Sequence, residues 1–253
     1  MILDWMTLSM DLVTRADRAP GPQAKLLAPV DETAVLDRCA QYRDGLKGAG
    51  VSFPAALLRF TTVREWMRRQ RVALHVTTDG ELALAVVAGT EPGRIVIHPH
   101  EGLGRPTHRT VGARVVVSSS GQVARLAAPA GERRQVLVDA TADDVSALAS
   151  EVLAHGRLDL VGLHCRLALG DVVGALTVSR AIGEMSWIQR RHDVLVTQIS
   201  VANLDVGQRC ERWILRRVVG AISEVIDDAC ARHRFPRPGL TLAPTCGALL
   251  VGQ

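Results

Sequence analysis

The chain has 253 residues, of which 47% are hydrophobic and 22% are charged, so it can bury a full core and is not a disordered polymer. Its net charge of +4 comes from 30 basic and 26 acidic residues without a run of five like charges, and only 3% of residues are aromatic. This composition argues against a basic tail and against nucleic-acid binding.

Five widely spaced cysteines form no C-x-x-C pair, which favours reduced thiols over a zinc ribbon or a disulfide framework. The first twenty residues carry Asp4 and Asp11 inside their apolar run, so we expect neither a signal peptide nor a membrane span. We assign residues 1–24 to an N-terminal extension and residues 25–253 to one domain. A cytoplasmic protein without membrane contact is predicted.

From about residue 26, short β-branched runs alternate with helical patterns. A helix is predicted from Asp31, a candidate N-cap, to the glycine at position 50. Eight strands follow, separated mostly by helical crossovers, at residues 51–58, 72–78, 94–100, 114–120, 135–141, 160–167, 194–202 and 240–245. The count favours an α/β fold made of a single TIM (β/α)8 barrel, with an open doubly wound sheet as the alternative.

In such a barrel, functional side chains lie at the C-terminal ends of the strands. His98 shares a strand face with His100, and His164 shares one with Arg166, because residues two apart point the same way. Cys165 points to the opposite face and is expected in the core beneath the helices.

Residues 75–98, HVTTDGELALAVVAGTEPGRIVIH, resemble the segment DVASGGELALALAAGVPPERIVFHG of the fold-type III pyridoxal-phosphate enzymes, the diaminopimelate and ornithine decarboxylase group. VVVSSSGQVARLA, LVGLHCRLALG and PRPGLTLAPTCGALLVG are similar to later blocks of that family, in the same order. The resemblance runs from about residue 25 to the end. It implies a TIM barrel of the decarboxylase type, without the β-domain that follows the barrel in the family.

The same resemblance places the Schiff-base lysine of the family at Ala56, and the two lysines of the chain, Lys25 and Lys47, lie elsewhere. An internal aldimine needs a primary amine, so we expect no covalently bound pyridoxal phosphate and no other cofactor. Ala243 stands where the family has the glutamate that pairs with the pyridine nitrogen, and Arg166 where it has the ring-stacking histidine. Classical amino-acid decarboxylation is therefore not expected.

We predict a catalytic group of His75, Asp139 and Arg166, since histidine titrates near neutrality and a guanidinium holds carboxylates; mutually paired structural groups are the alternative. His98 and His100, with His75 or Asp139, also form a metal-ligand pattern, but three convergent ligands are not established, so no metal is predicted. The predicted substrate-binding residues are Arg59, His98, His100, His164, Asn203, Asp205 and Cys246.

Three functions are compatible with these residues. The favoured hypothesis is a biosynthetic enzyme, independent of pyridoxal phosphate, that acts on a small anionic metabolite with His75 as acid/base and Arg166 as anchor. The second is an inactive pseudoenzyme that forms a homodimer, or a heterodimer with a decarboxylase homologue or another biosynthetic protein. The third is a non-covalent binder of pyridoxal phosphate or another small molecule.

Overall fold

The computed structural model describes residues 30–98, 112–128, 133–167, 172–206 and 211–250. Within them, eight parallel strands close into a barrel in which each strand pairs with the next along the chain and the last pairs with the first. This topology confirms the single TIM barrel and excludes the open sheet.

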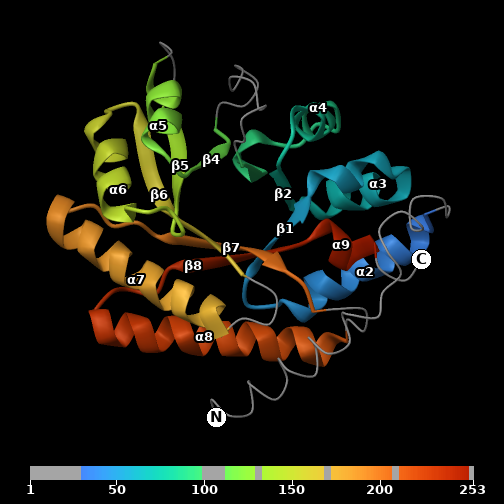
Figure 1. The fold of residues 1–253 in the computed structure, drawn as a ribbon. Helices are drawn as coiled ribbons and strands as arrows, with labels where there is room; N and C mark the ends of the chain where they lie inside the picture. Colours follow the sequence, from blue (N-terminus) through green and yellow to red (C-terminus); the bar gives the residue numbers. More distant parts are fainter. Residues whose placement is uncertain (1–29, 99–111, 129–132, 168–171, 207–210, 251–253) are drawn as a thin grey trace.

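The strands are β1 (Gly50–Pro54), β2 (Ala73–Val76), β3 (Ile95–Ile97), β4 (Arg114–Val117), β5 (Arg134–Asp139), β6 (Leu158–Arg166), β7 (Gln198–Leu204) and β8 (Gly239–Pro244). The helices are α2 (Glu32–Gly45), α3 (Thr61–Gln70), α4 (Asp79–Val87), α5 (Ser120–Ala127), α6 (Val145–Ala154), α7 (Val172–His192), α8 (Arg212–His233) and α9 (Cys246–Leu250), with short 3-10 turns η2 (Ala55–Arg59) and η3 (Pro92–Arg94). Figure 1 shows α7 and α8 side by side along one flank of the barrel, and α3 and α4 together on another.

The first helix begins where the sequence predicts. The Asp31 carboxylate accepts hydrogen bonds from the backbone N–H groups of Thr33 at 2.9 Å and Ala34 at 3.2 Å, which satisfies donors that the helix itself leaves free. Helix α2 then packs against α3, α8 and α9, as expected for a helix that precedes the first strand and closes the outer ring.

Several predicted boundaries are wrong: the first helix ends at Gly45, not at residue 50, β4 ends at Val117, not at residue 120, and the limits of β1 and β7 also differ. Strand β1 ends at Pro54, and residues 55–59 form the η2 turn in place of the last four residues of the predicted strand. Leu57 and Leu58 are buried, and the Leu57 carbonyl accepts a hydrogen bond from Phe60 N–H, so apolar packing drives this tight turn. Strand β7 begins at Gln198, four residues later than the pattern suggests.

The hydrophobic core lies mainly between the barrel and its helices. Outward-facing residues such as Leu74, Ile95, Ile97 and Cys165 are at most 1% exposed, which confirms the prediction that Cys165 belongs to the core. A separate apolar layer fills the barrel interior, from Val96, Val116, Leu137 and Val161. Toward the C-terminal ends of the strands the interior becomes polar.

Close approach of β6 and β7 requires a glycine. A Cβ added at Gly162 would lie 2.0 Å from the carbonyl oxygen of Gln198, a contact that only a backbone shift could relieve. The two strands can therefore pair closely at this point. In the resulting register His164 lies beside Ser200 and Arg166 lies beside Ala202.

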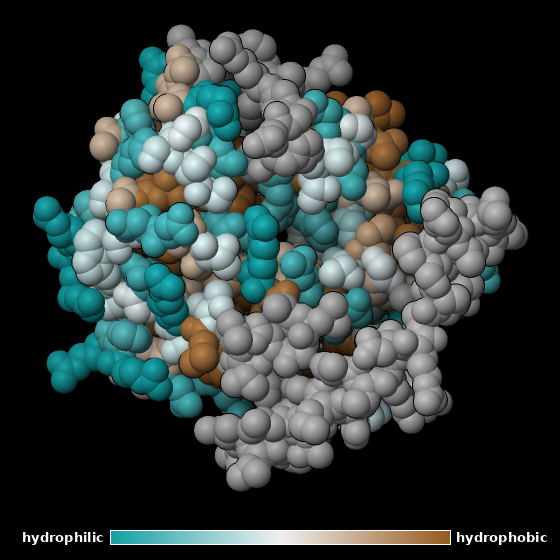
Figure 2. Space-filling model, in the orientation of Figure 1, coloured by the Kyte–Doolittle hydropathy of each residue, from teal (hydrophilic) through white to brown (hydrophobic). Residues whose placement is uncertain are grey.

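Figure 2 shows polar side chains spread over the face seen in Figure 1, with apolar residues in small scattered patches. None of the helices in the described part of the chain combines the length and the apolar character needed to cross a lipid bilayer.

Candidate functional site at the barrel mouth

An ion pair links the ends of two neighbouring strands. Arg166 Nη2 lies 3.0 Å from Asp139 Oδ2, while Asp139 Oδ1 accepts hydrogen bonds from Thr141 N–H at 3.0 Å and from the Thr141 hydroxyl at 2.6 Å. The Asp139 side chain is 2% exposed, whereas that of Arg166 is 51% exposed. Both carboxylate oxygens are thus engaged, and the guanidinium, which carries five N–H donors, keeps donors that open to the barrel mouth.

Three histidine rings contact one another next to this ion pair. The ring of His98 lies between His75, at a centroid distance of 6.0 Å, and His164, at 4.7 Å, both in edge-on geometry. His98 directly follows β3, so its contact with His75 joins neighbouring strands, whereas its contact with His164 of β6 crosses the barrel. The sequence indicates strand ends but not which of them meet across the interior.

Hydrogen bonds orient two of these rings. His75 Nδ1 lies 3.2 Å from the carbonyl oxygen of Ser52, so it carries the proton and leaves Nε2 as an acceptor. His164 Nδ1 lies 3.2 Å from the hydroxyl of Ser200. His164 Nε2 is buried and has no hydrogen-bond partner among the described residues. A buried nitrogen without a partner is a polar position that a ligand or water would satisfy.

Burial keeps all three histidines neutral at physiological pH. It lowers the pKa of His98 to about 2, with further lowering by the neighbouring His164 and His75. Burial, followed by the Arg166 charge, lowers the pKa of His164 to about 3, and burial lowers that of His75 to about 4. These rings therefore offer neutral donors and acceptors, and near pH 7 His75 can accept a proton at Nε2 but is not in the imidazolium form that acts as a general acid.

The other predicted site residues do not join this cluster. Arg59 is exposed, with its guanidinium 4.6 Å from the centroid of the Phe60 ring. Burial raises the pKa of Cys246, against a smaller lowering by the Arg59 charge. Asp205 accepts a 3.4 Å hydrogen bond from Thr245. Asn203 is exposed and adopts a left-handed conformation, with φ of 63°. His100 lies outside the described residues. Five of the ten predicted residues therefore form the cluster, namely His75, His98, Asp139, His164 and Arg166.

Sequence reasoning missed the residues that support this cluster. Ser52, Thr141 and Ser200 each bond to one of its members. Glu81 was also missed: its carboxylate accepts from Thr77 N–H at 2.6 Å, and its charge raises the pKa of His75 against the larger effect of burial. A T-x-x-E capping pattern at 78–81 and a D-x-T pattern at 139–141 are signals that could have found Glu81 and Thr141.

Small side chains occupy two positions at the mouth. Ala56, in η2, is partly exposed beyond the end of β1. Ala243 is 3% exposed and alternates with Leu240 and Leu242 of the helix-facing core, which places its methyl group on the inner face of β8. Lys47 precedes β1 and therefore lies toward the opposite end of the barrel. In the described ranges, no three His, Cys, Asp or Glu side chains are arranged to hold a metal ion.

Comparison with known proteins was made on sequence and on structure. No protein-family profile matches the chain. Two curated relatives are diaminopimelate decarboxylases: that of Actinosynnema pretiosum is 26% identical over 85% of the chain, and that of Mycobacterium leprae is 28% identical over 74%. The matches cover 56% and 47% of those proteins, so the chain spans about half the length of the curated relatives.

Solved structures show the same barrel. Ornithine decarboxylase from Entamoeba histolytica superimposes with a TM-score of 0.68 at 14% identity, over 97% of this chain and 72% of that one. Diaminopimelate decarboxylase from Helicobacter pylori, complexed with L-lysine, gives a TM-score of 0.65 at 13% identity, over 85% and 62%. The chain is a homologue of the barrel domain of the fold-type III pyridoxal-phosphate decarboxylases.

Proposed function

We propose that this barrel works without covalently bound pyridoxal phosphate and binds a small anionic metabolite at its mouth, anchored by Arg166. The observation that carries the proposal is the half-exposed guanidinium of Arg166, fixed by the buried carboxylate of Asp139. A preoriented guanidinium with donors to spare recognises carboxylates and phosphates through two parallel hydrogen bonds.

The residues present do not suit the covalent cofactor of the relatives. Attachment as a Schiff base requires a lysine amine at the rim, and Ala56 occupies the position that the resemblance assigns to it. Ala243 presents a methyl group where a carboxylate would stabilise a protonated pyridine nitrogen. Both substitutions support a ligand that binds by hydrogen bonds and charge alone.

The neutral histidines give the proposed site a second polar wall. His164 Nε2, buried and without a partner among the described residues, adds an uncharged hydrogen-bonding position to the cationic one of Arg166. A ligand that carries an anionic group and a hydroxyl, carbonyl or amine would satisfy both. Small hydroxy acids, keto acids and amino acids are the substrate class that this pairing favours.

One observation favours turnover as a second function. The hydrogen bond from His75 Nδ1 to the Ser52 carbonyl leaves Nε2 free to accept a proton from a bound metabolite. Its lowered pKa, about 4, makes it a weak base. Turnover by this base is therefore expected to be slow and to fall as the pH drops toward that value, because the protonated ring can no longer accept a proton.

Titration calorimetry with a panel of hydroxy, keto and amino acids tests the binding function. Arg166→Gln should weaken binding of the best ligand about tenfold or more, the cost of losing a charge-assisted pair, and Arg166→Lys should recover part of it. Arg133→Gln, which removes an exposed arginine just before β5, is the matched control. Equal affinity of Arg166→Gln and the unchanged protein would refute the anchor.

His75→Gln separates binding from turnover. If the barrel is only a binder, this variant keeps its affinity for the ligand and no product forms with either protein. If His75 is a base, ligand binding persists while product formation, followed by mass spectrometry, is lost. A panel in which no compound binds would refute the proposed function as a whole.

A further inference from the structure

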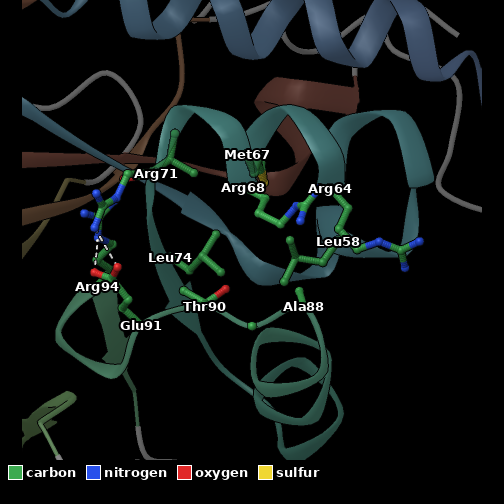
Figure 3. A pocket seen from close by; sticks show the side chains of 12 residues that line it. Leu58, Arg64, Met67, Arg68, Arg71, Leu74, Ala88, Thr90, Glu91 and Arg94 are labelled. Atoms are coloured by element: carbon green, nitrogen blue, oxygen red, sulfur yellow. Dashed lines mark hydrogen bonds and ion pairs between the residues drawn. The ribbon is translucent and has the colours of Figure 1, made fainter.

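A second polar site lies on the outer wall of the barrel. A cavity of about 60 Å³ opens between α3 and the segment that joins α4 to β3. Its floor is apolar, with Leu58 and Leu74 each 1% exposed. Figure 3 shows the side chains that surround this floor, including four arginines and one carboxylate, namely Arg64, Arg68, Arg71, Arg94 and Glu91. We call this cavity the α3–α4 groove.

Glu91 is fully committed to two of the arginines. Its Oε1 lies 2.6 Å from Arg71 Nη2, and its Oε2 lies 3.0 Å from Arg94 Nε. The hydrogen bond and charge of Arg71, followed by the charge of Arg94, lower the pKa of this carboxyl group. Arg94 also donates to the carbonyl of Arg71, which fixes the two guanidiniums side by side at one end of the groove.

Arg68 has no partner of this kind. No hydrogen bond or ion pair joins its guanidinium to another described residue, and it extends over the floor of the groove near Leu58 (Figure 3). Arg68 is also not needed as a hydrogen-bond donor to the carbonyl groups in the last turn of α4. Those carbonyls already accept hydrogen bonds from the backbone N–H groups of residues 88–90. The Thr90 hydroxyl adds an uncharged donor that points into the same space (Figure 3).

We propose that the α3–α4 groove binds the phosphoryl group of a small molecule. Because the Arg64 charge acts on Glu32, the groove itself has Arg68, Arg71 and Arg94 against Glu91, an excess of two positive charges, which matches a dianion better than a carboxylate. The cavity has room for one phosphoryl group, since on the same measure about 10–15 Å³ already holds a water. The apolar floor strengthens the charge interactions by excluding solvent from one side.

This site is separate from the barrel mouth. Arg71 and Arg94 precede β2 and β3, so they lie toward the N-terminal ends of the strands, whereas Arg166 lies at the C-terminal end of β6. A substitution that abolishes ligand binding at one site should therefore leave binding at the other site unchanged. Arg166→Gln should bind phosphate at the groove with unchanged affinity.

Titration calorimetry with inorganic phosphate in a low-salt, phosphate-free buffer tests the groove. Arg68→Gln should weaken phosphate binding about tenfold or more, and Arg68→Lys should weaken it less because the charge remains. Arg69→Gln is the matched control: Arg69 is the adjacent exposed arginine in the last turn of α3, and it does not line the groove. It should change the affinity by less than about twofold, since only bulk charge is lost.

Further arms identify the source of the phosphoryl group. Glycerol phosphate binding more tightly than inorganic phosphate would support a phosphorylated metabolite, and the reverse order would support free phosphate. Acetate binding as tightly as phosphate would overturn the preference for a dianion. The proposal also fails if no phosphate binds at millimolar concentration, or if Arg68→Gln and Arg69→Gln weaken binding equally.

Discussion

Acid should destabilise this protein through its three buried histidines. His75, His98 and His164 have pKa values lowered to about 4, 2 and 3 in the folded chain, while an unfolded histidine has a pKa of about 6.5. Between those limits the unfolded chain binds protons that the folded chain does not. Stability is therefore fully present above pH 6.5 and falls as the pH drops through 6.5 toward the folded values.

The size of the effect follows from proton linkage. Between pH 7 and pH 5 each buried neutral histidine lowers the free energy of unfolding by about 2 kcal/mol, so the three together lower it by about 6 kcal/mol. Aspartate and glutamate titrate mainly below this window, which isolates the histidines.

Urea unfolding at pH 7, 6 and 5 measures this loss directly. His98→Leu removes the central ring and keeps its apolar contacts, so about one third of the pH dependence should disappear. A stability that stays flat between pH 7 and pH 5 would refute the burial of these rings. The same conclusion would follow if His98→Leu kept the full pH dependence.

Two further predictions concern packing and thiol reactivity. Gly162→Ala should abolish cooperative folding, because its methyl group would lie 2.0 Å from the Gln198 carbonyl; thermal unfolding with a wild-type midpoint would contradict this. Cys39 and Cys165, whose pKa values burial raises to about 12, should resist alkylation near pH 8, whereas the partly exposed Cys246 should react before either of them, as peptide mass spectrometry of the labelled native protein would show. Labelling of Cys165 before Cys246 would contradict the described core.

The sequence predicted the fold well because one pattern, a β-branched run followed by a helical segment, recurs along the chain. Eight β-branched runs separated by helical segments recover all eight strands, and the Asp31 cap marks the start of α2 within one residue. Errors arose where packing competes with local propensity. Leu57 and Leu58 continue an apolar run that is typical of a strand, yet in the structure they turn inward against the core as η2.

The site was harder to predict, because contacts across the barrel depend on closure. Asp139 and Arg166 end neighbouring strands, and their nearness follows from strand order alone. The contact of His98 with His164 does not, since β3 and β6 meet only across the interior. Arg59 ends η2 and Cys246 begins α9, so they belong to segments that follow β1 and β8 and not to the strands that carry the histidines.

The proposed function requires a barrel mouth that holds its ligand without a covalent bond. Native mass spectrometry of the protein incubated with pyridoxal phosphate, before and after borohydride reduction, tests this claim directly. We predict that any bound pyridoxal phosphate dissociates on desalting and that reduction leaves no pyridoxyl group on the chain. A stoichiometric pyridoxyl adduct that survives digestion and maps to Lys25 or Lys47 would contradict it.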